Sequence, residues 1–353
     1  PDRGVTVVKL AGLWSTWAII ACLYCLCRWY WDGQYVFSIQ VLAYAAIPLV
    51  VLSLPYMFWI DGALVKQRDH TWHFGALLLM RPGWDAEEIK RHWRAWIIKA
   101  FFTAFMISNI PFAFRTVVTA DIAEVMARPE RVVLTAIEAM FMIDVMIGTV
   151  GYIVTMRPLD AHIRSGNPLL AGWVAALICY PPLVWGILGD GRAINYEQNA
   201  AGWLHWLAGH DTLIAVWGGV LVLLTGIYAW ATFAFGLRFS NLTYRGVLTN
   251  GPYRFTRHPA YLSKNLFWWC SVLPFLVTTG SPVEAIRNSF FLLVVNGIYF
   301  WRAKTEEAHL LAEDPKYREY YAWMAHNGLI TAPLTKLWNR FRPRPAISVE
   351  ATR

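Results

Sequence analysis

The segment Gly251-Pro-Tyr-Arg-Phe-Thr-Arg-His-Pro-Ala-Tyr261 is a dense run of polar groups between two apolar stretches of the chain. Its Gly-Pro and His-Pro pairs favour an irregular turn, because a residue before proline avoids the helical conformation. Arg, His and Tyr side chains follow one another along this turn. Polar groups are costly beside a membrane and usually mark a functional site there. The segment therefore predicts a link between two membrane helices that wraps a polar ligand at the membrane surface.

The remainder of the chain has the composition of a membrane protein. Of its 353 residues 57% are hydrophobic and 15% are charged, against roughly 25% charged in soluble proteins. An apolar run of ~18 residues can cross the ~30 Å core of a bilayer as a helix. We therefore expect an all-α integral membrane protein with about eight transmembrane helices. The expected spans are Val7–Cys27, Val36–Trp59, Ala95–Val118, Val132–Thr155, Pro168–Leu188, Thr212–Phe235, Leu262–Thr278 and Ala285–Tyr299. The last two are short and predict a helical hairpin that turns at Thr279–Pro282.

The net charge of +8 is spread unevenly over the links between these spans. Lys and Arg residues fall mostly on alternate links, whereas the links between those carry Arg28, Arg128, Arg131 and Arg192. By the positive-inside rule, this pattern predicts a multi-pass protein with both termini in the cytoplasm, in a bacterial inner membrane. The basic excess then reflects topology and contact with anionic lipid, and no nucleic-acid partner is expected. The first apolar run is too long for a cleavable signal peptide, and none is expected.

The chain divides by character into three regions. Residues 1–210 hold five of the expected spans, residues 211–335 hold three spans and the dense polar motifs, and residues 336–353 form a basic tail that contains proline. In the long link of the first region, Asp85 could cap a short amphipathic helix on the membrane surface. No metal site is expected: Cys22, Cys25 and Cys27 are best explained as packing residues, and the repeated His boxes of membrane di-iron enzymes are absent.

A second polar motif, Arg302-Ala-Lys-Thr-Glu-Glu307, follows the first by about 40 residues. Asn296, Tyr299, Arg302 and Glu306 are spaced three, three and four apart and share one helix face. This face is apolar before Asn296 and charged after Tyr299, so the last helix is expected to leave the membrane here. A carboxylate at this position can accept from ribose hydroxyls or an ammonium group, and an arginine can hold a carboxylate.

The two motifs together resemble the isoprenylcysteine carboxyl methyltransferase and phospholipid N-methyltransferase superfamily. That family has Gly-Pro-Tyr-Arg-x-x-Arg-His-Pro-x-Tyr, followed by Arg-x-x-x-Glu-Glu on the final helix. A Tyr-rich segment and a proline come next, here Pro315–Tyr321 and Pro333. The resemblance covers about residues 236–335, with both motifs in the family's order and at its separation.

The resemblance implies an enzyme that binds S-adenosylmethionine on the cytosolic side and methylates a membrane lipid or lipidated acceptor. The residues it assigns to the cofactor are Tyr253, Arg257, His258, Pro259, Tyr261, Asn265, Glu306 and Glu307. Arg302, nearest the acceptor, and Glu306 are the expected catalytic residues. Lys264, Asn296, Tyr299, Glu138 and Asp144 are candidates for the substrate cavity.

Other interpretations stay open on the residues alone. Glu138 and Asp144 could instead form a structural pair with Arg115. The family usually has glycine soon after the tyrosine of the first motif, whereas Ser263 and Lys264 stand here, and Lys264 could contact an anionic headgroup or the cofactor carboxylate. An NADPH-dependent sterol or polyprenyl reductase and a non-catalytic membrane-complex subunit are the alternative functions. The methyl acceptor and the oligomeric state are not predicted.

Overall fold

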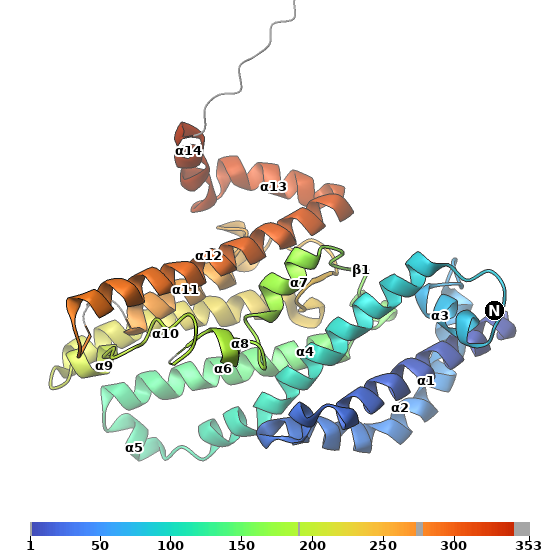
Figure 1. Ribbon diagram of the computed structural model, residues 1–353, viewed down its shortest axis with the longest axis horizontal. Helices are drawn as coiled ribbons and strands as arrows, with labels where there is room; N and C mark the ends of the chain where they lie inside the picture. Colours follow the sequence, from blue (N-terminus) through green and yellow to red (C-terminus); the bar gives the residue numbers. More distant parts are fainter. Residues whose placement is uncertain (1, 190, 273–277, 342–353) are drawn as a thin grey trace, which may run out of the picture.

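The computed structural model describes residues 2–189, 191–272 and 278–341, which form an all-α protein with one two-stranded sheet. Within these ranges six helices are long and apolar enough to cross a membrane. Figure 1 shows α6, α10, α11 and α12 stacked beside one another, with α4 crossing from this stack toward α1 and α2. The six are α1 (Arg3–Leu26), α2 (Val36–Ala63), α4 (Ala86–Val118), α6 (Pro129–Ile153), α10 (Asp211–Phe235) and α12 (Pro282–Glu313).

One of the eight expected spans does not form a long helix, and a second extends beyond the described part of the chain. The stretch Pro168–Leu188 is divided into α7 (Leu170–Leu177) and α8 (Val184–Ile187), so the expectation of one continuous span is wrong. Pro181 and Pro182 lie in the break, where proline cannot donate the backbone hydrogen bond that a helix needs. The stretch Leu262–Thr278 begins within α11 (Pro259–Val272), and its residues 273–277 lie outside the described part of the chain.

The cap at Asp85 is where the sequence predicts it, but the helix that follows is not a separate surface helix. The Asp85 carboxylate accepts from the backbone N–H groups of Glu87 at 2.8 Å and Glu88 at 3.0 Å. The helix it begins is α4, which continues for 33 residues to Val118. The helix is not interrupted where the polar turns before Ala95 meet the apolar span that begins there, so both belong to one element.

The N-terminal helices pack through small residues. Helix α3 (His70–Leu78) lies against α1, and Gly12 and Gly75 meet at the contact. A Cβ on Gly12 would collide with the Thr71 carbonyl, and one on Gly75 would collide with the Val8 carbonyl. Glycine is required at both positions because the two backbones approach so closely. The short elements of this half are η1 (Arg28–Trp31), η2 (Gly33–Tyr35) and α5 (Ile122–Met126).

A two-residue sheet positions the loops of the second half. Strand β1 (Ser165–Gly166) pairs antiparallel with β2 (Thr243–Tyr244), which joins the segment after α6 to the segment after α10. Helices α6 and α10 also pack against each other across residue 210, and the division of the chain at that residue stays a prediction. The other elements are η3 (Arg157–Leu159), α9 (Trp203–Trp206), η4 (Gly236–Arg238), η5 (Gly251–Arg254), α13 (Pro315–Asn327) and α14 (Thr331–Phe341).

Candidate functional site

The two polar motifs converge on one cavity of about 160 Å³. Its walls come from the end of α10, the segment 238–248, η5, the first turns of α11 and the second half of α12. Of the residues assigned to the site from sequence, those that line the cavity are Tyr253, Arg257, His258, Tyr261, Lys264, Tyr299, Arg302 and Glu306. Two motifs separated by about 40 residues therefore contribute to a single site.

Backbone geometry explains the start of the first motif. Gly251 has φ +57°, in the left-handed region that side chains rarely adopt, and a Cβ there would lie 3.3 Å from Cβ of Ala234. The chain then turns through η5, which presents Tyr253 to the cavity. The Tyr320 hydroxyl on α13 donates to the Tyr253 carbonyl at 2.6 Å, and burial raises the pKa of the Tyr253 hydroxyl. Helix α13 thus holds the η5 turn in place through this hydrogen bond.

Glu307 ties the two motifs together. Its carboxylate accepts from Arg257 Nε at 2.8 Å, from Lys304 Nζ at 2.7 Å and contacts His258 Nε2 at 3.0 Å. The side chain is only 4% exposed and does not line the cavity. Because its two oxygens are already engaged by three cationic or imidazole groups, Glu307 positions Arg257 and His258 rather than facing a ligand.

Glu306 and Arg302 form the inner wall. Arg302 is 2% exposed; its Nε lies 3.3 Å from Glu306 Oε1, and its Nη2 donates to Asn241 Oδ1 at 2.6 Å. The Tyr261 hydroxyl donates to the same Glu306 oxygen. A buried guanidinium is stable only when paired and hydrogen-bonded, and these contacts meet that need. The pair places one fixed positive charge and one carboxylate at the cavity wall.

Three aromatic rings surround Lys264. Its ammonium lies 5.6 Å from the ring centre of Tyr228, 5.4 Å from that of Trp268 and 5.7 Å from that of Tyr299. Across the described residues, no carboxylate lies within ion-pair distance of this ammonium. Cation–π contacts stabilise it in part. Lys264 therefore offers an uncompensated positive charge to whatever enters the cavity.

The rings of His258 and Tyr261 lie almost parallel, with an interplanar angle of 6° and a centroid separation of 5.6 Å. Pro259 between them is the first residue of α11, a position that suits proline because its missing N–H would be unpaired anyway. The proline does not line the cavity; it sets the start of the helix directly after His258 and two residues before Tyr261.

Besides Glu307 and Pro259, four further predicted residues lie outside the cavity wall: Asn265, Asn296, Glu138 and Asp144. Asn296 on α12 donates to Asn265 Oδ1 on α11 and accepts from Trp269 Nε1 at 2.7 Å, so these amides join the two helices. The Asp144 carboxylate accepts from the Thr232 hydroxyl at 2.5 Å. Neither Asp144 nor Glu138 forms an ion pair with Arg115 in the described part of the chain, which leaves the predicted structural pair unformed.

Sequence reasoning did not identify several residues that build the site. Asn241 receives Arg302, and its Nδ2 donates to the Tyr180 hydroxyl at 3.1 Å. Arg245 is 3% exposed and donates to the carbonyls of Gly151 at 2.7 Å and Phe239 at 2.9 Å, and also to those of Val154 and Ala161. Burial lowers the pKa of Arg245 to about 10. A lone arginine in a link gives no signal in the sequence, although Tyr180 stands beside a conspicuous Pro-Pro pair.

Residues 215–323 match the sequence model of a family described as a protein of unknown function (DUF1295). The matched range contains most of α10, all of α11 and α12 and both polar motifs, so it covers most of the cavity wall. No curated protein and no solved structure matches the chain.

Proposed function

We propose that this protein is an integral membrane methyltransferase that uses S-adenosylmethionine and acts on a lipophilic acceptor. One observation carries the proposal: both polar motifs line a single cavity, and Arg302 and Glu306 meet at its wall. The motifs resemble those of the isoprenylcysteine carboxyl and phospholipid methyltransferases. The cavity lies among apolar helices, which favours an acceptor that reaches it from the bilayer.

The residues at the cavity fit the polar groups of S-adenosylmethionine. Lys264 has no carboxylate partner among the described residues and could hold the carboxylate of the cofactor. The Glu306 carboxylate, 22% exposed, could accept from an ammonium or from ribose hydroxyls. The ring pair of His258 and Tyr261 offers flat faces to a planar base or a positively charged sulfur. Donors, acceptors and rings are thus present in the combination that this cofactor requires.

Arg302 supplies the fixed charge for the acceptor. When bound, the cofactor provides a methyl group on a positively charged sulfur, which an acceptor oxygen, nitrogen or sulfur attacks as the carbon–sulfur bond breaks. Arg302 would orient an anionic or polar acceptor atom, and Glu306 would hold the guanidinium in place. Positioning of this kind and exclusion of water are the main means by which a protein accelerates such a displacement.

A reductase that uses NADPH is less compatible with the arrangement of the arginines. NADPH carries several phosphate groups, which proteins usually bind with free arginine or lysine side chains. Arg238 donates to Asp160 at 2.6 Å, Arg257 is held by Glu307, and Arg245 is engaged by backbone carbonyls. Within the described wall, Lys264 is the cation that lacks a protein oxygen. One available cation suits a single carboxylate better than a set of phosphates.

Calorimetric titration tests the proposal. The protein purified in detergent should bind S-adenosylhomocysteine saturably and should not bind NADPH. His258→Ala and Glu306→Ala should abolish binding, whereas His326→Ala and Glu319→Ala, which change exposed residues on α13, should leave it unchanged. Binding of NADPH alone would move the protein to the reductases. Binding of neither ligand by a folded sample would favour a non-catalytic role.

A further inference from the structure

A second cavity, of about 150 Å³, lies between the N-terminal helices and the body of the protein. It shares no lining residue with the first cavity. Its walls come from α1, the end of α2, the start of α3, α4 and the segment that follows α6. The walls supplied by α1 and α2 are mostly apolar, and the rest mix polar groups with Ala95, Trp96 and Ile163. The polar lining includes Lys9, Asp69, His70, Lys99, Arg157 and His162.

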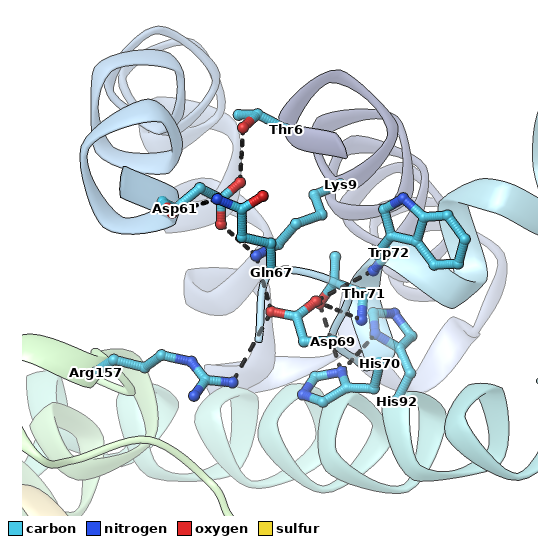
Figure 2. Close-up of polar contacts among 10 residues, drawn as sticks. All are labelled: Thr6, Lys9, Asp61, Gln67, Asp69, His70, Thr71, Trp72, His92 and Arg157. Atoms are coloured by element: carbon cyan, nitrogen blue, oxygen red, sulfur yellow. Dashed lines mark hydrogen bonds and ion pairs between the residues drawn. The ribbon is translucent and has the colours of Figure 1, made fainter. Parts of the chain in front are cut away.

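Lys9 lines this cavity, and two carboxylates already neutralise its charge. Its side chain is 1% exposed, and its Nζ lies 2.5 Å from Asp61 Oδ1 and 3.0 Å from Asp69 Oδ2. Figure 2 shows Lys9 between these two carboxylates, with Thr6 donating to Asp61 at 2.8 Å from the other side. A buried ammonium needs such partners to be stable. Lys9 therefore holds the helices together and has little capacity left for a ligand.

Lys99 is different, because its partners are neutral. Its ammonium donates to the Thr155 hydroxyl at 2.7 Å and to the Ile153 carbonyl at 3.3 Å, and it lies 4.8 Å from the ring centre of Trp96. In the residues that the structure describes, no carboxylate forms an ion pair with it. The half-buried cation thus faces the cavity with its charge uncompensated.

Two further groups at the cavity can serve as donors. Arg157 is 38% exposed and reaches toward Asp69, but the separation of 3.9 Å is too long for a hydrogen bond (Figure 2). The Nδ1 atom of His162 is buried and has no hydrogen-bond partner in the described ranges of the chain. A buried polar atom without a partner is uncommon in proteins and calls for an explanation. Lys99 comes from α4, and Arg157 and His162 come from the segment after α6; the hydrogen bond from Lys99 to Thr155 joins these two parts of the cavity wall.

The charges leave the cavity positive. Lys9, Lys99 and Arg157 carry three positive charges and Asp61 and Asp69 carry two negative ones, so one positive charge remains even if the histidines are neutral. A phosphate group carries at least one negative charge and accepts several hydrogen bonds. Such a group on a lipid would also suit the apolar walls that α1 and α2 supply.

We propose that this second cavity binds a phosphate group, held by Lys99, Arg157 and His162. An anionic lipid headgroup is the expected source, because basic pockets between membrane helices at the bilayer surface favour such headgroups. Free phosphate offers the same chemistry and is distinguished by experiment. The proposal does not depend on the methyltransferase function.

The test measures binding of three probes to the full chain in a neutral detergent by calorimetry: dihexanoyl phosphatidic acid, inorganic phosphate and dihexanoylglycerol, which has no phosphate. Phosphatidic acid should bind and dihexanoylglycerol should not. Lys99→Gln should weaken binding about tenfold, the loss expected when one hydrogen bond between charged groups is removed. Comparable affinity for inorganic phosphate would identify free phosphate as sufficient.

Matched variants separate a built site from general attraction between charges. Lys66→Gln removes an exposed lysine that does not line the cavity and should leave binding unchanged. Arg157→Gln, at a partly exposed position, should reproduce the loss if Lys99→Gln fails to fold, and Arg81→Gln is its exposed control. Absence of binding by both phosphate probes, or an equal loss in Lys66→Gln and Lys99→Gln, would overturn the proposal.

Discussion

Single residues in the links, as well as the motifs, hold the loops of the candidate functional site in place. Arg245 contacts carbonyl groups from the end of α6, from the segment that follows it and from the segment after α10. A guanidinium has five donors in a fixed plane, so one side chain can connect chain segments that have no regular structure between them. The neighbouring strand β2 and Asn241, which binds Arg302, lie on the segment that Arg245 holds.

Replacement of Arg245 by methionine should destabilise the protein by about 2–3 kcal/mol, because the buried carbonyls lose a charged donor. The midpoint of thermal unfolding in detergent is expected to fall by several degrees. Arg318→Met is the matched control: Arg318 also donates to carbonyls, at 2.6 Å to Leu311, but it is exposed, so water can replace it. Equal shifts for the two variants would contradict this role for Arg245.

Lys264→Met tests which group the uncompensated ammonium holds, on the assumption of the proposed function. If Lys264 binds the carboxylate of the cofactor, the affinity for S-adenosylhomocysteine should fall about tenfold or more. 5′-Methylthioadenosine lacks the amino-acid portion and should bind the wild type and the variant alike. A variant that binds S-adenosylhomocysteine normally but transfers methyl groups slowly would assign Lys264 to the acceptor instead.

At the scale of elements, polar caps mark where two of the long helices begin. Asp85 and Ser281 are polar caps before apolar runs, and both begin helices in the structure. The same local signals do not predict that α4 continues through the polar turns into the membrane. Length and hydropathy also favour a helix over Pro168–Leu188, although Pro181 and Pro182 break it.

The same limit applies to the candidate site. The motifs predict eight of its lining residues, because each motif is contiguous or lies on one helix face. They do not predict Asn241, Tyr180 or Arg245, whose places depend on the pairing of β1 with β2 and on the broken segment after α7. Contacts between distant links leave no periodic pattern in a sequence. The sequence likewise does not reveal that Asn265 and Asn296 hydrogen-bond to each other between α11 and α12, and their roles at the site stay predictions.

The capping box at Ser281 provides a test at this scale. The Glu284 backbone N–H donates to the Ser281 hydroxyl at 3.4 Å, and the Ser281 N–H donates to the Glu284 carboxylate at 3.1 Å. Ser281→Ala should cost about 1 kcal/mol, the usual loss for an N-cap. Ser281→Thr keeps the hydroxyl and should retain most of the stability. The two unfolding midpoints can be compared directly, and an equal loss in both would show that the cap is unimportant.

At the scale of the whole molecule, a charge network attaches the N-terminal helices to the rest. Asp69 accepts at 3.1 Å from the backbone of Thr71 and so caps α3, pairs with Lys9 of α1 and lies near Arg157, which follows α6. The segment that carries Arg157 continues to Asp160, which pairs with Arg238 beside the first cavity. The two cavities are therefore bordered by one link. Conditions that weaken the charge network at one cavity should also change the position of this link at the other.

Two titrating groups in this network, Asp69 and His70, make the folded protein less stable as the pH falls. Burial alone would raise the pKa of Asp69, but Lys9 and His70 bring it below its usual value. Its contribution is therefore fully present above the unfolded pKa of about 3.9 and is lost as the pH falls through the lower folded value. Burial lowers the pKa of His70, as do Arg157 and Lys9, although Asp69 and Glu88 oppose this shift. The unfolded chain takes up that proton first, so stability also declines below about pH 6.5.

Asp69→Asn separates these two effects, because asparagine can still cap α3 but cannot carry the charge. Unfolding midpoints measured between pH 7 and pH 3 should decline for both proteins below about pH 6.5, where His70 becomes protonated on unfolding. The wild type should be the more stable near neutral pH, and its advantage should shrink below about pH 4 as Asp69 loses its charge. Asp61→Asn removes a carboxylate that pairs with Lys9 but does not line the second cavity, and it should lower stability as well. A difference between wild type and Asp69→Asn that stays constant over this pH range would mean that the charge of Asp69 does not join the two parts of the protein.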